Sequence, residues 1–146
     1  MIAPGANLPW GRYGGDFGAN AWRPGGGLSV SLPDDLDVTL AQARRAGAEV
    51  IRWFVFCDGR AGFDWTPAGP RLQPVVIDDM HAALDALGRH GLRMVPVLFD
   101  FTWTRPRRVE HGVELGGRVG VLRDPIARHD LWRAIDGLLS EVGRDA

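Results

Sequence analysis

Tryptophans are concentrated in segments that read as loops, and this placement is the strongest chemical signal in the sequence. The 146 residues include six tryptophans and a single tyrosine. An indole face stacks on the apolar face of a sugar ring, and a neighbouring Asp or Arg can hydrogen-bond the hydroxyls. Covering the end of a core is an equally good explanation of such residues. The loop tryptophans are Trp10, Trp22, Trp65 and Trp103.

Arg52 is a charge within an otherwise apolar run, residues 50–56. Strand alternation places Arg52 and Phe54 on one face and Trp53 on the other. A buried guanidinium is costly unless a carboxylate or a ligand pairs with it. Arg52 is therefore expected either to hold a catalytic carboxylate or to form an internal ion pair, and we favour the first. Trp53, and Trp132 on a predicted helix, are expected in the core.

Asp100 lies near the carboxyl end of a second apolar run, residues 94–101. Parallel α/β folds display functional side chains at this end of their strands. An Asp that only terminates the strand is the alternative. Pro96 within the same run is unexpected, because proline removes a donor from the hydrogen-bond ladder.

The carboxylates do not form an obvious catalytic pair. Hydrolysis of a glycosidic bond needs two carboxyl groups about 5 to 9 Å apart, and the chain has four glutamates. Glu49 is expected at the amino end of a strand and Glu141 on a helix. Glu110 and Glu114 lie in a loop rich in arginine, where surface ion pairs are the better interpretation.

Other chemistries are poorly represented. All 17 basic residues are arginine, which excludes a lysine Schiff base and a P-loop. The single Cys57 excludes an internal disulfide and Cys-pair metal sites, the histidines lack metal-ligand spacing, and no serine lies in a nucleophile elbow. The sequence thus predicts neither a metal nor a cofactor.

Charge and hydropathy exclude several partners. The formal net charge is −1 and acidic residues separate the basic ones, so neither nucleic acid nor an anionic membrane is expected as a partner. No stretch approaches the roughly 20 apolar residues of a membrane span. The amino-terminal residues do not read as a signal peptide, and the compartment stays open.

Helical and extended patterns alternate along one domain, residues 1–146. Two amphipathic helices are predicted to end at Gly47 and Gly91, each followed by one of the apolar runs. Asp124 and Pro125 mark the start of a third helix. The continuous apolar runs favour a parallel sheet covered on both faces, and hence an α/β fold.

Loop lengths favour a barrel without excluding an open sheet. The segments from strand to helix, about 57–77 and 102–123, are long, whereas the reverse connections are short. A (β/α)₈ barrel builds its active face from the former, but so does a doubly wound sheet. A complete barrel needs about 250 residues. We therefore expect an incomplete barrel of three β/α units that requires the remaining barrel half for stability.

Several motifs together resemble the cellulase-like clan A glycoside hydrolases related to family five. Residues 5–10, GANLPW, and 13–18, YGGDFG, followed by Trp22, are similar to the start of these enzymes, where a Gly-x-Asn motif ends the first strand. IRWF at 51–54 resembles the second-strand signature, whose arginine supports the nucleophile. VLFDFTW at 97–103 resembles the end of the third strand, and LGGR at 115–118 the loop that follows.

The resemblance implies a (β/α)₈ barrel and retaining hydrolysis of β-linked glycans by two glutamates, one following an asparagine at the end of the fourth strand and one ending the seventh. Neither position lies within this chain, so the chain alone is expected to be inactive. Arg52 carries over as the nucleophile support. The expected substrate-binding residues are Asn7, Trp10, Asp16, Trp22, Asp58, Asp100 and Trp103. Two alternatives remain: a non-catalytic carbohydrate-binding pseudoenzyme module, and a small open α/β sheet that binds a different ligand.

Overall fold

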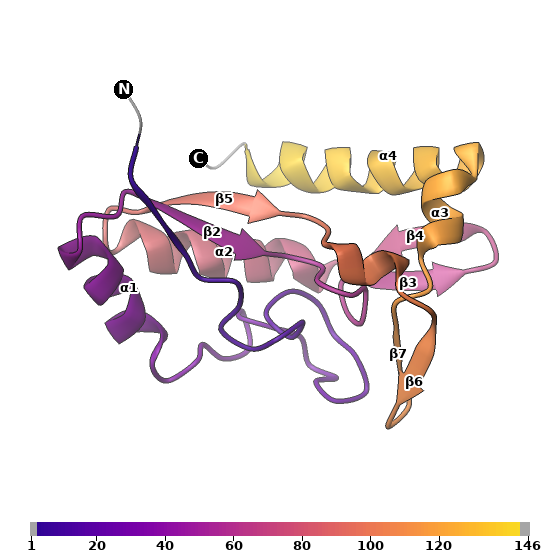
Figure 1. Cartoon of the computed structure of the whole chain (residues 1–146), viewed down its shortest axis with the longest axis horizontal. Helices are drawn as coiled ribbons and strands as arrows, with labels where there is room; N and C mark the ends of the chain where they lie inside the picture. Colours follow the sequence, from indigo (N-terminus) through magenta and orange to yellow (C-terminus); the bar gives the residue numbers. More distant parts are fainter. Residues whose placement is uncertain (1–2, 144–146) are drawn as a thin grey trace.

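A three-stranded parallel sheet lies at the centre of the computed structural model, which describes residues 3–143 (Figure 1). The strands run in the order β1-β2-β5. Gly5 pairs with Val50, and Val50 with Arg93, so all three strands start at one level and run in the same direction. The α/β class with a parallel sheet is confirmed. The strand bounds are β1 Gly5–Asn7, β2 Val50–Phe54 and β5 Arg93–Val97.

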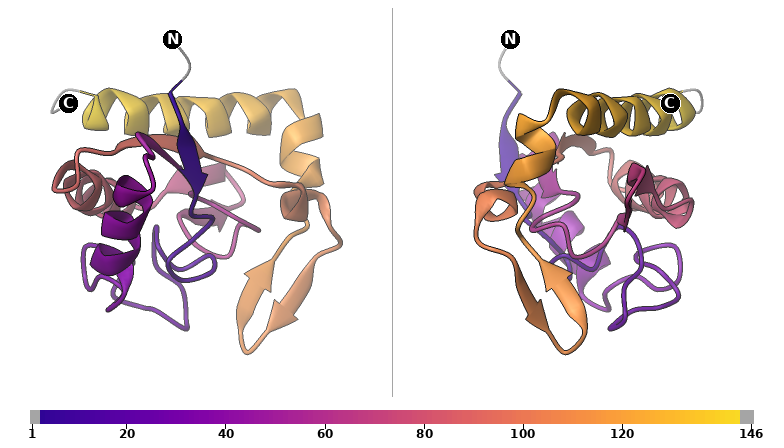
Figure 2. Two further views of the ribbon diagram at one scale, coloured as in Figure 1. Left: turned by 60° about the vertical axis from the view of Figure 1, so that its left-hand side comes forward. Right: turned by 90° about the vertical axis from the view of Figure 1, so that its right-hand side faces the viewer.

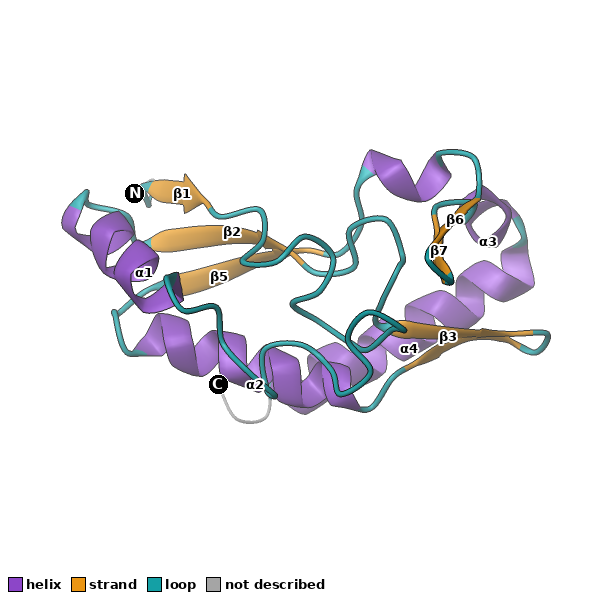
Figure 3. Ribbon diagram, turned by 90° about the horizontal axis from the view of Figure 1, so that it is seen from below, coloured by secondary structure: helices purple, strands orange, loops and turns teal. Residues whose placement is uncertain are grey.

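Three helices cover one face of this sheet, as the views in Figures 2 and 3 show. They are α1 (Leu36–Arg45), α2 (Val75–Gly88) and α4 (Pro125–Val142). Their apolar stripes enclose Ile51 and Trp53, which are 1% and 0% exposed. The predicted core position of Trp53 is confirmed. Trp132 was expected in the core but is 48% exposed, because it lies outside the buried stripe of α4.

The opposite face of the sheet is exposed in the described part of the chain. It carries Arg52 and Val95, which are paired in register, and Val95 is 49% exposed. The prediction that both faces of the sheet are covered is wrong for residues 3–143. Arg52 is consequently exposed, so its charge does not have the desolvation cost that the sequence implied.

Pro96 is accommodated because, within residues 3–143, β5 has β2 on one side and an open edge on the other. Arg93 donates its N–H to Glu49 O of the neighbouring chain segment at 2.9 Å. Successive N–H groups of a strand point to opposite sides, so the nitrogen of residue 96 faces the open edge. The missing donor therefore removes no bond to β2, in agreement with the tolerance of edge strands for proline.

Local signals fixed the helix ends. The Asp124 side chain accepts hydrogen bonds from the N–H groups of Ile126 and Ala127 at 2.9 and 2.8 Å, with Pro125 in the first turn, as predicted. Gly47 and Gly91 follow α1 and α2 with positive φ angles of 92° and 63°. That conformation suits glycine and turns the chain toward the next strand.

The two long connections contain structure that the sequence did not reveal. The first forms a hairpin of β3 (Phe63–Thr66) and β4 (Gly69–Leu72). The second begins with a 3₁₀ helix, η1, continues as a hairpin that projects from the body in Figure 1, and ends in the short helix α3. Their bounds are η1 Phe101–Thr104, β6 Arg108–Glu110, β7 Val113–Leu115 and α3 Val119–Arg123.

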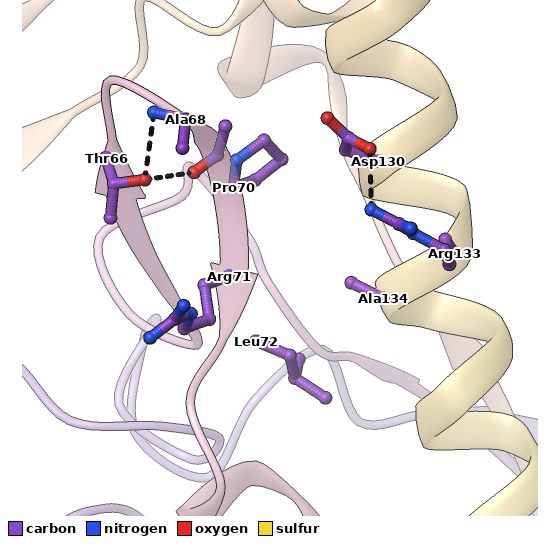
Figure 4. A pocket seen from close by; sticks show the side chains of 9 residues that line it. Thr66, Ala68, Pro70, Arg71, Leu72, Asp130, Arg133 and Ala134 are labelled. Carbon is purple, nitrogen blue, oxygen red and sulfur yellow. Dashed lines mark hydrogen bonds and ion pairs between the residues drawn. The ribbon is translucent and has the colours of Figure 1, made fainter.

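The β3-β4 hairpin packs against α4 and leaves a cavity of about 370 Å³ between them (Figure 4). On the α4 side, Asp130 accepts a hydrogen bond from Arg133 at 2.9 Å, and on the hairpin side Thr66 caps the turn through Gly69 O. Thr66, Asp130 and Arg133 thus have hydrogen-bond partners within their own wall of the cavity. We assign it to the packing of the hairpin.

Asp79 of α2 fastens the amino-terminal loop, residues 8–35, to the body. Its carboxylate is fully buried and accepts from Gly18 N at 2.7 Å, Gly27 N at 3.1 Å, and Ser29 N and Oγ at 2.8 and 2.5 Å. Gly27 cannot be replaced without movement, since a Cβ there would lie 1.9 Å from Asp16 O. This carboxylate therefore determines the path of the loop.

Candidate functional site

The carboxyl ends of the strands open into a pocket of about 500 Å³, which we call the aromatic pocket. Its rim carries Trp10 and Tyr13, whose rings meet edge to face at 4.7 Å between centroids. Such a mixture of aromatic rings and a few polar groups is typical of ligand sites. The lining residues are Trp10, Tyr13, Arg52, Phe54, Val97, Phe99, Asp100, Phe101 and Thr102.

Arg52 is held at the floor of the aromatic pocket by two contacts. Its Nη1 donates to Asn7 Oδ1 at 3.0 Å, which joins the ends of β2 and β1. Its guanidinium carbon lies 4.4 Å from the centroid of the Phe54 ring. A cation held over an aromatic ring loses little rotamer freedom when it binds an acceptor. The structure therefore brings the predicted Arg52 and Asn7 together.

Asp100 and Phe101 form the opposite wall. Asp100 caps η1, because its Oδ1 accepts from the Thr102 N–H at 2.6 Å and from the Thr102 hydroxyl. Phe101 is 69% exposed and has the Arg105 guanidinium carbon 4.8 Å from its ring centroid. The strand ends at Val97, three residues before Asp100, so Asp100 reaches the pocket through the loop.

Two predicted substrate residues, Asp16 and Asp58, are buried and do not line the pocket. Asp16 is 2% exposed and accepts from Gly11 N at 2.6 Å, Arg12 N at 2.9 Å and Trp53 Nε1 at 2.9 Å. Burial raises the pKa of Asp16, and these hydrogen bonds oppose the rise. The Asp58 carboxylate, also 2% exposed, accepts from Arg60 Nε and Nη2 at 2.9 and 2.8 Å.

Of the remaining loop tryptophans, Trp103 is buried against other aromatic rings and Trp22 is exposed. Trp103 is 1% exposed, donates to Phe56 O at 3.3 Å, and meets Phe99 at 4.2 Å between centroids. The ring centroid of Trp65, on β3, lies 5.7 Å from that of Trp103. Trp22 is 39% exposed, and the Arg60 guanidinium carbon lies 5.1 Å from its ring centroid. The structure does not place Trp22 or Trp103 among the residues that line the aromatic pocket.

Tyr13, Phe101 and Thr102 line the pocket but were not singled out from the sequence. Burial raises the pKa of the Tyr13 hydroxyl. Tyr13 belongs to the quoted YGGDFG segment and Phe101 to VLFDFTW, so their position beside recognised motifs was the available signal.

Three glutamates form ion pairs away from this pocket. Glu49 pairs with Arg93 at 3.3 Å, and Glu110 with Arg108 at 2.7 Å. Glu114 is held by two arginines, and the hydrogen bond from Arg107 is the main reason that its pKa is lowered. The interpretation of Glu110 and Glu114 as surface ion pairs is confirmed. Within residues 3–143, no cluster of three metal-ligating side chains occurs, and none of the helices could cross a membrane.

Comparison with known proteins gives a likeness of fold. The chain matches no family model and no curated protein. Among solved structures, a β-mannanase from the blue mussel Mytilus edulis superposes with a TM-score of 0.63 at 21% identity, over 88% of this chain and 33% of that one. A β-1,4-mannanase from the common sea hare Aplysia kurodai gives 0.62 at 20%, over 97% and 37%. An exo-β-1,4-mannosidase from Opitutaceae bacterium strain TAV5 gives 0.53 at 20%, over 94% and 22%.

These matches define the class of the chain as an α/β protein with the fold of one part of such glycoside hydrolases. It spans about a third of the length of the two β-mannanases. The resemblance to cellulase-like glycoside hydrolases that the motifs indicated is confirmed at the level of the fold.

Proposed function

We propose that this chain contributes the first three β/α units of a (β/α)₈ glycoside hydrolase barrel that acts on β-1,4-linked mannans. One observation carries the proposal: an aromatic rim and the Arg52–Asn7 pair lie together at the carboxyl ends of three adjacent parallel strands. Barrel enzymes place their active site at this end. The mannan substrate is taken from the names of the structural neighbours.

In this proposal the residues of the aromatic pocket bind the sugar and prepare the site. Trp10 and Phe101 offer ring faces to the sugar, and Asp100 accepts hydrogen bonds from its hydroxyls. Arg52, oriented by Asn7, supports a nucleophilic carboxylate and keeps it ionised. We reassign Asp16, Asp58 and Trp103 to holding the loops, because all three are buried.

The catalytic carboxylates of the proposal lie outside this chain. Among the described residues that line the aromatic pocket, Asp100 is the one carboxylate, and hydrolysis needs two. The chain alone is therefore expected not to hydrolyse aryl β-mannosides. Turnover that disappeared in Glu110→Gln or Glu114→Gln would contradict this.

The rest of the barrel is the proposed partner. In the described part of the chain β5 has an open edge, and an apolar groove beside it is lined by residues of α2, β5 and α4, among them Met94, Pro96 and Leu139. A further parallel strand along β5 would cover both. Sequencing the gene beyond the codon for Ala146 tests this part, since a strand that ends in Asn-Glu is expected there.

Calorimetry with mannohexaose and cellohexaose tests the sugar-binding part on the chain itself. We expect mannohexaose to bind and Phe101→Ala to weaken binding. The absence of binding to either sugar by the folded chain would refute the proposal. A carbohydrate-binding pseudoenzyme is the second candidate, favoured by the single carboxylate among the described lining residues. A complete gene product that binds mannohexaose without hydrolysing it would establish that candidate.

A further inference from the structure

A second pocket, of about 410 Å³, lies on the other side of Arg60 from the aromatic pocket, and we call it the outer pocket. It is bounded by β3, by the β6-β7 hairpin and by the loop before Trp22. Its volume is within the range of small-molecule sites. The lining residues that carry polar or aromatic groups are Asn20, Arg60, Phe63, Asp64, Trp65, Glu114 and Arg118.

A ridge of three stacked side chains separates the two pockets. The Arg60 guanidinium carbon lies 4.4 Å from the Tyr13 ring centroid and 5.1 Å from that of Trp22. Tyr13 lines the aromatic pocket and Arg60 lines the outer one. The pockets are therefore neighbours across one stacked pair. Tyr13 and Trp22 are 36% and 39% exposed, so both rings retain surface for a sugar to contact.

Arg60, the middle side chain of the ridge, is held in place by Asp58 and Asn20. Asp58 receives two parallel hydrogen bonds from its guanidinium, and Asn20 Nδ2 donates to Arg60 O at 3.3 Å. Bidentate pairs of this kind fix direction as well as distance. A ligand that crosses the ridge would therefore meet an ordered surface, which lowers the entropic cost of binding.

The outer pocket is polar but balanced in charge. Arg60 and Arg118 are matched by Asp64 and Glu114 among the lining residues. Arg118 is 7% exposed and forms an ion pair with Glu114 at 2.7 Å. Its guanidinium carbon lies 3.9 Å from the Trp65 ring centroid. A charged ligand gains no net attraction from such a lining, whereas a neutral polyhydroxylated ligand finds donors and acceptors that are already in position.

We propose that the outer pocket extends the carbohydrate-binding cleft, so that a long β-linked glycan crosses the ridge of Tyr13, Arg60 and Trp22 and places its further sugar residues there. This inference rests on the proposed function, and it assigns the predicted residue Trp22 a place on the path of the glycan. It implies that affinity rises with chain length beyond what the aromatic pocket alone provides.

The experiment compares mannobiose with mannohexaose by calorimetry on the full chain. Mannohexaose is expected to bind about tenfold more tightly or better. Asp64→Asn and Glu114→Gln should each weaken mannohexaose by about fivefold and leave mannobiose unchanged. Phe101→Ala, in the aromatic pocket, should weaken both sugars.

Glu110→Gln is the matched control, because Glu110 lies on the same hairpin as Glu114 but does not line the outer pocket. Melting temperatures of the variants identify any loss of folding. Equal affinity for the two sugars, or mannohexaose binding that survives both Asp64→Asn and Glu114→Gln, would overturn the outer pocket while leaving the aromatic pocket in place. Failure of both sugars to bind the wild-type chain would instead refute the proposed function.

Discussion

Arg52 and Asn7 come from different strands, 45 residues apart, and meet through a 3.0 Å hydrogen bond from Nη1 to Oδ1. The register that pairs these two residues across β1 and β2 makes the contact possible. Because Arg52 is exposed, the bond contributes little to folding and orients a side chain that faces the pocket. A substitution at this pair is therefore expected to change ligand affinity more than the free energy of unfolding.

Asn7→Ala should release Arg52 and lower affinity for mannohexaose. We expect a loss of about threefold to tenfold, with the free energy of unfolding changed by no more than about 0.5 kcal/mol. Calorimetry and urea denaturation measure the two effects. A large loss of stability with unchanged affinity would mean that the pair serves the sheet and not the ligand.

Asp79→Ala should destabilise the chain strongly, because it would leave four hydrogen-bond donors of Gly18, Gly27 and Ser29 without their acceptor. The expected loss is about 3 kcal/mol. Asp78→Ala is the matched control, since Asp78 is the exposed neighbour on the same helix. Urea unfolding curves that coincide for the two variants would contradict the role given to Asp79.

Gly27→Ala and Gly88→Ala should change stability in opposite directions. At Gly27 a methyl group would collide with Asp16 O, and the loop must shift. At Gly88, near the end of α2, a Cβ would meet nothing within 4 Å, so alanine should add up to about 1 kcal/mol through helix propensity. Thermal unfolding compares them. A stabilised Gly27→Ala variant would show that the loop path is adaptable.

Cys57 should resist thiol reagents in the folded chain. The side chain is 1% exposed, and burial raises its pKa to about 12. An unfolded thiol loses its proton above about 8.5, whereas the folded one keeps it. Stability should therefore fall as the pH rises from about 8.5 toward 12. Ellman's reagent at pH 8, with and without urea, tests the burial; rapid labelling of the native chain would contradict it.

Val95→Lys should reduce the exposed apolar surface of the sheet without unfolding it. Val95 is 49% exposed and lies in the open face beside Arg52. We expect weaker binding of an apolar fluorescent dye and a stability change within about 0.5 kcal/mol. Val38→Lys, at an exposed position of α1, is the control and should leave dye binding nearly unchanged. Equal dye signals from both variants would show that the open face does not bind the dye.

Residues whose environment is set by neighbours in the chain were predictable. Alternation along residues 51–53 placed Arg52 opposite Trp53, and Asp124 with Pro125 marked the start of α4 correctly. The burial of Arg52 was wrong because it depends on what covers the sheet. The alternation of side chains along a strand predicts which residues share a face of the sheet. It does not predict whether another part of the protein covers that face.

The long connections were less predictable because their form depends on distant contacts. Aspartate is a common residue in sugar-binding sites, but the loop turns back at Asp16. Its carboxylate therefore accepts hydrogen bonds from Gly11, Arg12 and Trp53 and not from a ligand. Trp132 was misplaced for a related reason, since a helix position one step off the stripe points outward. The hairpins β3-β4 and β6-β7 carried no turn signal that was recognised in advance.

The attachment of the amino-terminal loop to Asp79 also sets an order of events during synthesis. The bonds to Gly18, Gly27 and Ser29 join positions 61, 52 and 50 residues apart. A nascent chain meets these contacts only after α2 has left the ribosome, and closing so long a loop is slow compared with forming a helix. The segment that carries Trp10, Tyr13 and Trp22 is thus made before the carboxylate that holds it, which leaves it open to proteases and chaperones until α2 has emerged and the contacts have formed.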